Sequence, residues 1–266
     1  MQTVTSSDGT KIAFETSGSG PALVLVHGTS ASSARWGNIK PLLEPHFTVY
    51  VVDRRGRGGS GDTPAGTAYD YRCEFADIAA VVEAAKDPVI LFGHSYGGLL
   101  SLGAAGLTGK IAAMVLYEAP VSLGGGFSED LLARMDAAVA SGDRDTVLKI
   151  FCEEVVQMRA SDIAALRASP AWPARLAAAH TIPRELRTAG VFALGSVHAE
   201  RITAPTLLLH GADSPEFFKQ SMARLAGTIP HAKTVALAGQ QHVAMDTAPE
   251  LLTQSVLDFW RGIVQR

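Results

Sequence analysis

A serine, an acid and a histidine follow one another along the chain in an order that suits nucleophilic catalysis. Ser95 lies at the centre of Gly93-His-Ser-Tyr-Gly97, a G-x-S-x-G motif, and Asp213 and His242 come later. A histidine can take the proton of a serine hydroxyl, and a carboxylate can hold the imidazole in the required tautomer. The order nucleophile, acid, base is the one that accompanies this motif. We therefore expect Ser95, Asp213 and His242 to form a catalytic triad.

The residues around Ser95 predict the sharp turn that such a nucleophile needs. The apolar run Val89–Phe92 precedes the motif, and the helix-like run Leu99–Ala105 follows it. Glycines flank the serine because the strand and helix backbones come too close there for side chains. The turn would lift Ser95 above a sheet, at the N-terminus of a helix whose dipole favours a developing negative charge.

A second glycine turn predicts where the negative charge of the transition state is held. His27-Gly28-Thr29-Ser30 directly follows the apolar run Ala22–Val26. The backbone N–H groups of Thr29 and Tyr96 are expected to point to the space above Ser95 as an oxyanion hole. One such donor can contribute about 3 kcal/mol to transition-state stabilisation. His27 is expected to support its turn, and His94, next to the nucleophile, to line the pocket.

The identity of the acid has an alternative. Asp213 follows the apolar run Pro205–His210, where a carboxylate can reach an imidazole, but Ser214-Pro215 also opens a helix that Asp213 could cap. Glu118 follows another apolar run, Ile111–Tyr117, and is the rival acid.

Two further patterns are interpreted as structural. Gly56-Arg-Gly-Gly-Ser-Gly61 formally matches a dinucleotide motif, but helix signals resume only near Phe75, too far along for that site. Arg54, Arg55 and Arg57 are flanked by acidic residues and are expected to shape a loop. The sequence predicts neither a cofactor nor a metal site.

The order of apolar runs and helix-length segments predicts the fold. Continuous Val, Leu and Ile runs are typical of strands buried on both faces of a parallel sheet, and Lys11–Glu15 alternates like an antiparallel edge strand. We expect an α/β protein with a mostly parallel sheet of about eight strands, flanked by helices that include Phe75–Ala85 and Pro249–Trp260. Ligands then bind beyond the carboxyl ends of the strands. The predicted buried strands are Ala22–His27, Phe47–Asp53, Pro88–Gly93, Ile111–Tyr117, Pro205–His210 and Lys233–Leu237.

One stretch, 121–201, contains no convincing strand. We interpret it as a helical cap inserted into a core made of 1–120 and 202–266, although ordinary surface helices would give the same pattern. The expected helices are Ser128–Ala140, Asp143–Met158, Ser161–Ala168 and Pro173–Ala179, with Ser128, Asp143 and Ser161 as N-caps. Candidates to line an apolar substrate pocket, or else to pack inside the cap and core, are Trp36, Phe127, Met135, Trp172 and Phe192.

These motifs together resemble the α/β-hydrolase superfamily over nearly the whole chain. The stretch Asp53–Ser60 is similar to the family's D-x-R-G-x-G-x-S loop, and a helical cap at 121–201 falls where the family places one. Family epoxide hydrolases and haloalkane dehalogenases carry Asp at the elbow, where this chain has Ser95. The resemblance is greatest to the capped group of serine esterases, lactonases, C–C hydrolases and cofactor-free haloperoxidases.

Composition narrows the class of protein further. The 266 residues carry a formal net charge of -3, with 47% hydrophobic and 18% charged residues, which argues against disorder and against nucleic-acid binding. The two cysteines, Cys73 and Cys152, form neither a disulfide framework nor a zinc motif. Without a visible signal peptide or transmembrane run, we expect a cytoplasmic monomer or small homo-oligomer without membrane insertion.

The expected activity is that of a serine hydrolase with a small-molecule substrate. It would cleave a carboxylic ester, thioester or lactone with a hydrophobic moiety through an acyl-enzyme. The alternatives are a cofactor-independent C–C hydrolase, lyase, perhydrolase or cyclase on the same fold, and a catalytically silent ligand-binding protein.

Overall fold

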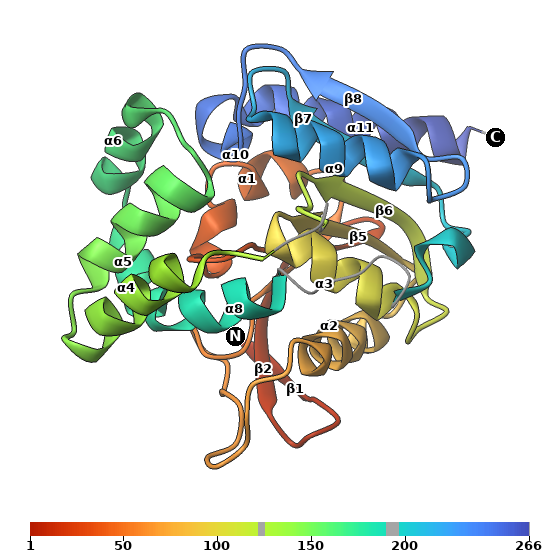
Figure 1. Cartoon of the computed structure of the whole chain (residues 1–266). Coiled ribbons are helices and arrows are strands. Elements are labelled where there is room, and N and C mark those ends of the chain that lie inside the picture. Colours follow the sequence, from red (N-terminus) through yellow and green to blue (C-terminus); the bar gives the residue numbers. More distant parts are fainter. Residues whose placement is uncertain (122–125, 190–196, 266) are drawn as a thin grey trace.

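A computed structural model describes residues 1–121, 126–189 and 197–265 of the chain, arranged around one eight-stranded sheet (Figure 1). The strand order is β1-β2-β4-β3-β5-β6-β7-β8, with β1 and β2 antiparallel to their neighbours and the other pairs parallel. The prediction of a mostly parallel sheet of about eight strands is confirmed. The strands are β1 (Gln2–Thr5), β2 (Lys11–Gly18), β3 (Ala22–Val26), β4 (Thr48–Val52), β5 (Val89–His94), β6 (Ile111–Tyr117), β7 (Thr206–Gly211) and β8 (Lys233–Leu237).

The edges of the sheet differ from the sequence prediction. The segment expected as an edge strand is β2, which is antiparallel as predicted but pairs with both β1 and β4. The true edge, β1, is too short and polar to stand out in the sequence. At the other edge, β8 pairs with β7 alone in the described sheet, and only its Leu237 is buried.

Helices cover both faces of the sheet because alternate strand residues point to opposite sides. Val24 and Val26 face one helical layer, whereas Leu23 and Leu25 face the other. The first layer holds α2 (Arg72–Ala84), α3 (Tyr96–Ala105) and α9 (Glu216–Ala226). The second holds the 3-10 helix Ser33–Trp36, α1 (Lys40–Leu43), α10 (Ala244–Thr247) and α11 (Pro249–Val264).

Between β6 and β7 the described residues form helices and loops only. In Figure 1 the helices α4, α5 and α6 lie together on one side of the sheet, and α8 crosses towards α3. These elements are α4 (Glu129–Ala140), α5 (Arg144–Ile150), a π-helical turn (Phe151–Val155), α6 (Ala160–Ala168), α7 (Trp172–Ala178), a 3-10 turn (Ala179–Thr181), α8 (Ile182–Ala189) and a 3-10 turn (Ala199–Arg201).

Two of the three predicted N-caps are present. The Ser128 hydroxyl accepts a hydrogen bond from the Leu131 N–H at 3.2 Å, and the Asp143 carboxylate accepts one from the Thr146 N–H at 3.0 Å. The third prediction is wrong, because α6 already begins before Ser161 and Arg159 occupies its cap position.

The helical segment between β6 and β7 has an apolar core of its own, which we call the cap core after the cap expected from the sequence. Met135, Leu148 and Ile182 are almost completely buried there, and Phe218 reaches into this core from α9. Because Phe218 belongs to α9, which follows β7, a residue of the sheet-bearing part of the chain completes this apolar core.

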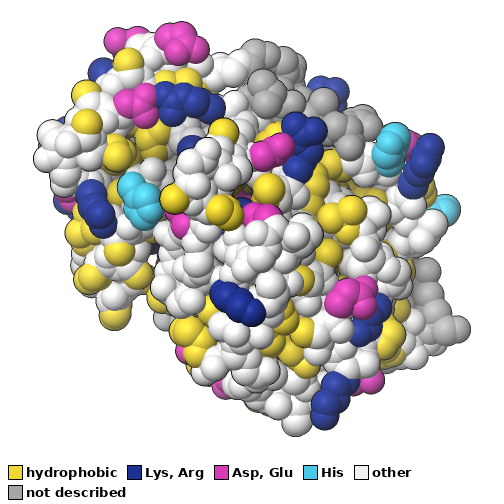
Figure 2. Space-filling view, turned by 90° about the horizontal axis from the view of Figure 1, so that it is seen from below, with side chains coloured by type: hydrophobic (Ala, Val, Ile, Leu, Met, Phe, Trp, Pro, Cys, Tyr) yellow, Lys and Arg dark blue, Asp and Glu magenta, His cyan; other side chains and the backbone are white. Residues whose placement is uncertain are grey.

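The surface mixes charges of both signs. On the face seen in Figure 2, acidic and basic side chains lie next to one another and between apolar ones. Exposed ion pairs such as Arg184 with Asp62, at 2.8 Å, are part of this pattern. In the described part of the chain, no helix combines the length and the apolar character needed to cross a membrane.

Candidate active site

Ser95 occupies the strained turn that its motif predicts. It lies between β5 and α3 with φ 55° and ψ -129°, a region that side-chain-bearing residues rarely adopt and that clusters at functional sites. The glycine after it is required by the backbone, since a Cβ on Gly97 would lie 2.4 Å from the Val26 carbonyl oxygen and 2.5 Å from that of His27. The N-terminal turn of α3 is thereby pressed against the end of β3.

The loop after β3 lies directly against the nucleophile. A Cβ on Gly28 would come within 2.8 Å of the Ser95 Cβ, so only glycine lets this loop pass so close. Thr29 follows, and Ser30 then reverses the chain with φ 57°. Thr29, Ser95 and Tyr96 line one cavity.

His27 supports this loop, as the sequence suggested. Its Nδ1 is 2.9 Å from the Gly28 carbonyl oxygen, and its Nε2 accepts from the Arg54 N–H at 3.2 Å. Burial and the charges of Arg57 and Arg54 hold the pKa of His27 well below its usual value. The ring is therefore neutral and bonded on both sides, which leaves it no role in proton transfer.

The carboxylate that meets His242 is Glu118. Its Oε2 lies 2.6 Å from Nδ1 of His242, and its Oε1 accepts hydrogen bonds from the Gly211 N–H at 2.7 Å and from the Ser214 hydroxyl. Glu118 is completely buried and follows β6 with φ 47°. Both carboxylate oxygens are thus held, and one of them is committed to the imidazole.

The prediction that Asp213 holds the imidazole is wrong. Its side chain is 53% exposed and its nearest charged partner is Arg159, 4.0 Å away. The Asp213 N–H donates to the Gln240 carbonyl and its own carbonyl accepts from the Gln241 side chain. These bonds turn the next residue, Ser214, inward instead, so the loop after β7 supplies a hydroxyl that supports Glu118.

The imidazole of His242 is held between two other rings. Phe218 stacks on it with centroids 4.3 Å apart and planes 16° apart, and the His94 ring centroid is 4.6 Å away. Nε2 of His94 is 2.9 Å from the His242 carbonyl oxygen. Burial and the neighbouring His242 hold the pKa of His94 well below its usual value. His94 therefore acts as a neutral donor that fixes the backbone of His242.

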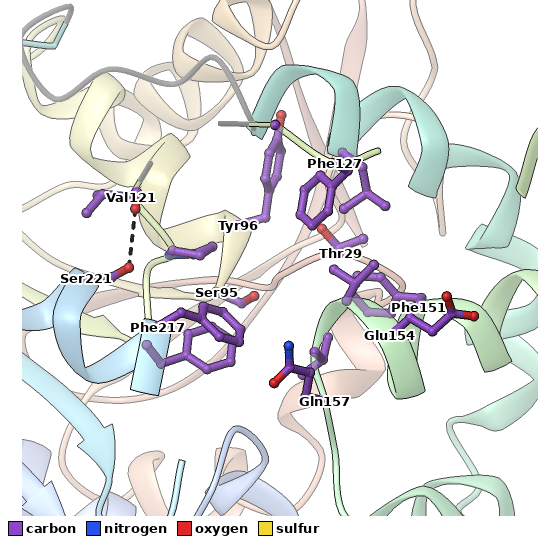
Figure 3. Close-up of a pocket in the computed structure, with 16 residues that line it drawn as sticks. Thr29, Ser95, Tyr96, Val121, Phe127, Phe151, Glu154, Gln157, Phe217 and Ser221 are labelled. Carbon is purple, nitrogen blue, oxygen red and sulfur yellow. Dashed lines mark hydrogen bonds between the residues drawn. The ribbon is translucent and has the colours of Figure 1, made fainter. Parts of the chain in front are cut away.

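A cavity of about 430 Å³ opens above Ser95 (Figure 3). In that view the phenyl rings of Phe127, Phe151 and Phe217 surround the space over the serine hydroxyl. The remaining lining residues are Thr29, Tyr96, Pro120, Val121, Gly126, Glu154, Val155, Val156, Gln157, Leu186, Phe218 and Ser221.

Of the pocket residues predicted from the sequence, Phe127 lines this cavity. Trp36 is fully buried in the sheet core against Phe92, and Met135 is fully buried in the cap core. Trp172 packs on the edge of the cap core beneath Arg167. Phe192 lies outside the described residues. Trp36 and Met135 have the apolar side chains expected of a pocket lining, but apolar side chains also fill protein cores, and that is where both residues lie.

The pocket residues that the sequence reasoning missed come from two places. Phe151, Val156 and Gln157 lie around the π-helical turn, and Phe217 and Phe218 open α9. The Phe217-Phe218 pair, one residue after Ser214-Pro215, was a usable signal, because residues that follow a strand end face the site in this fold.

The arginine loop after β4 is structural, as predicted, and it contacts α8. Arg54 makes two hydrogen bonds of 2.8 Å to Glu74 and one of 3.0 Å to Glu185 of α8, and Arg57 also donates to Glu185. All four side chains are buried. Burial raises the pKa of Glu185, but the Arg54 and Arg57 charges outweigh it and keep the net pKa below its usual value. We refer to these four residues as the ionic latch.

The fold and the position of the site at the carboxyl ends of the strands are those of a hydrolase. The alpha/beta hydrolase family matches residues 23–254, and the chain belongs to that family. Among solved structures, it is similar to an alpha/beta hydrolase from Sphaerobacter thermophilus DSM 20745, with 37% identity, a TM-score of 0.85 and coverage of 97% of this chain and 100% of that one. An esterase from Rhodococcus sp. ECU1013 has 25% identity, a TM-score of 0.71 and 97% coverage of both chains.

Two curated proteins add partial and full-length similarity. A pimeloyl-[acyl-carrier protein] methyl ester esterase from Xylella fastidiosa (strain M12) is 33% identical over 106 residues, 40% of this chain, and this chain spans only 39% of that relative's length. A 2-(acetamidomethylene)succinate hydrolase from Mesorhizobium japonicum is 27% identical over 261 residues, which cover 91% of this chain and 88% of the relative.

Proposed function

We propose that this protein is a serine hydrolase that cleaves carboxylic esters, thioesters or lactones through an acyl-enzyme. The observation that carries the proposal is the strained Ser95 turn, which lines the large cavity and also shares a smaller cavity of about 20 Å³ with the Glu118-bound His242. Similarity to proteins described as esterases supports ester cleavage in particular.

In the proposed mechanism, each group has one task. His242 takes the Ser95 proton while the oxygen attacks the carbonyl carbon, and the Thr29 and Tyr96 N–H groups bind the resulting oxyanion. His242 then gives the proton to the leaving group. Water, activated by the same imidazole, hydrolyses the acyl-enzyme and restores Ser95. Glu118 accepts the Nδ1 hydrogen bond throughout, which fixes the tautomer and stabilises the imidazolium.

The cavity suits a substrate with an apolar part. Four phenyl rings and several aliphatic side chains line it, and such surfaces bind apolar groups by removing them from water. Because Phe127, Phe151 and Leu186 belong to the helical segment between β6 and β7, we propose that 121–201 is a cap that shapes the substrate pocket.

Covalent labelling with a fluorophosphonate tests the nucleophile directly. The wild type should be labelled, Ser95→Ala should not, and its ester turnover should fall by about four to six powers of ten. Ser221→Ala is the matched control, because Ser221 lines the same cavity but its hydroxyl donates to the Val121 carbonyl at 3.2 Å. Labelling that survives Ser95→Ala, or that is lost only in Ser221→Ala, would contradict the proposal.

A further inference from the structure

A second, smaller cavity lies on the other side of Ser95. Its volume is about 20 Å³, which is room for one water molecule or a group of that size. Thr29, Ser95, Phe151 and Val156 line both this inner cavity and the larger pocket. A substrate bound to Ser95 can therefore extend into both.

The wall of the inner cavity contains a buried arginine without an ion pair. Arg175 of α7 is only 6% exposed, and its Nη1 donates to the backbone and hydroxyl oxygens of Ser30, at 3.2 and 3.0 Å. Its Nε has no hydrogen-bond partner among the described residues. No carboxylate in the described part of the chain forms an ion pair with it, unlike the guanidinium groups of the ionic latch.

The neighbouring charges leave an excess of positive charge at this wall. Arg35 also lines the cavity, and it forms an ion pair with Asp246 while its Nε and Nη2 stay without partners. Burial raises the pKa of the Cys152 thiol to about 11, so this neighbour is no counter-ion at neutral pH. Burial and the Arg35 charge lower the pKa of Arg175 to about 10, which still leaves the guanidinium charged. Two cations thus share one carboxylate.

A buried charge without a counter-ion is costly, and a neutral donor could hold Ser30 as well. A guanidinium is suited to a carboxylate, which it can bind through two parallel hydrogen bonds. From this geometry we infer that Arg175 binds a carboxylate of the substrate, so that the protein is selective for hemi-esters of short dicarboxylic acids.

The carboxylate is placed on the acyl part for a kinetic reason. The leaving alcohol must depart while the acyl-enzyme persists, so it needs the large pocket, whereas only the carboxylate end of a short acyl part has to reach the small inner cavity beside Arg175. The small volume restricts the acid to a short chain. The reaction is balanced by one water: the hemi-ester and water give the dicarboxylic acid and the alcohol. This inference rests on the proposed function.

The test compares a charged and a neutral ester of one acid. Release of phenol is measured for phenyl hydrogen succinate and for methyl phenyl succinate, with the malonate and glutarate homologues alongside. The wild type should have the higher kcat/KM for the hemi-ester. Arg175→Gln should lower that value by about 10- to 100-fold, the effect of losing a hydrogen bond to a charged group, and should leave the neutral diester within about threefold. Arg175→Lys should restore part of the preference.

The control Arg187→Gln removes an exposed cap charge that pairs with Asp136 outside the cavity and should change neither ester. Equal losses for both esters in Arg175→Gln would overturn the inference, because they would reveal only a role in holding Ser30. A wild-type preference for the neutral diester would overturn it as well, while Ser95-dependent cleavage of that diester would leave the proposed hydrolase function intact.

A binding experiment separates the two ideas if turnover is absent. Calorimetry on Ser95→Ala should give tighter binding of phenyl hydrogen succinate than of methyl phenyl succinate, and adding Arg175→Gln should abolish the difference. Equal affinities in Ser95→Ala would overturn the inference whatever the enzyme's activity. Absence of ester cleavage by the wild type would instead refute the proposed function alone.

Discussion

The contact between Glu118 and His242 leads to a prediction about which acid supports the imidazole. One substitution at Glu118 and one at Asp213 test it. In Glu118→Gln, the side chain keeps its shape but cannot satisfy both of its neighbours. If the amide NH₂ faces Nδ1 of His242, the ring must adopt the tautomer that cannot accept the Ser95 proton. If the amide oxygen faces His242, the NH₂ takes the place of Oε1, which in the wild type accepts the Gly211 N–H at 2.7 Å. Two hydrogen-bond donors then face each other with no acceptor between them.

The expected loss for Glu118→Gln is large. Replacing the acid of a catalytic triad by its amide lowers kcat by about 10⁴ in a well-studied serine protease, which corresponds to about 5.4 kcal/mol of transition-state stabilisation. The 2.6 Å contact and the complete burial of Glu118 place this site in the same regime. Asp213→Asn should stay within about twofold, because its exposed carboxylate lies 4.0 Å from Arg159 and such surface pairs contribute little.

The assay is release of nitrophenol from a short-chain nitrophenyl ester, with kcat and KM determined separately for the three proteins. Thermal melting of each variant verifies that the fold persists. A thousandfold loss in Asp213→Asn together with near-normal turnover in Glu118→Gln would refute the assignment of the acid. Comparable small losses in both would refute the need for a buried acid at all.

Three other predictions follow from local geometry. Gly97→Ala should lower the free energy of unfolding in urea by about 1–3 kcal/mol, because the added Cβ would clash with two carbonyl oxygens. The control Gly106→Ala should leave that free energy unchanged, because Gly106 has a φ of -78° and its added Cβ would have its nearest contact at 3.5 Å. Because the pKa of Glu185 is lowered in the folded state, its contribution to stability is present above about pH 4.5 and is lost as the pH falls through the folded value. Unfolding measured from pH 7 to pH 3 should therefore depend less steeply on pH in Glu185→Gln, and an unchanged slope would argue against the ion pairs. Phe127→Ala should change the preference for the length of the alcohol chain with little loss of stability. Met135→Ala should lower the free energy of unfolding by about 2–5 kcal/mol and leave that preference unaltered. The reverse outcome would mean that Met135 lines the pocket and Phe127 belongs to the core.

The architecture was predictable because its signals are local. The buried strands appear in the sequence as continuous apolar runs. The glycines around Ser95 predict its strained turn, because β3, β5 and α3 pack too closely there for side chains. The edge strand β1 was not predictable, since QTVT has neither length nor apolar alternation. Helix α8 was missed although Ile182 and Leu186 on its buried face and the exposed Arg187 give it an amphipathic pattern, and its buried Glu185 is explained only by the ionic latch.

The choice of acid and the pocket depended on relations that one sequence does not contain. Asp213 and Glu118 both follow strands that end near His242, and which one turns inward is set by the backbone bonds of Asp213 to the loop at 240–241. Trp36 and Phe151 are both large and apolar, yet one fills the sheet core and the other faces the substrate cavity. Their residue types predict that both side chains are buried, but not whether they pack in a core or line the substrate cavity.

The ionic latch limits how the proposed cap can move. Swinging α8 away from the core would leave the buried Arg54 and Arg57 without Glu185, and breaking a buried pair in this way costs about 3–5 kcal/mol. At equilibrium that corresponds to roughly one open molecule in a hundred to one in several thousand. Substrate exchange through a wholesale opening would be slowed by the same factor. Ligands should therefore enter and leave through small movements around Phe127 and Phe217, with the cap still seated.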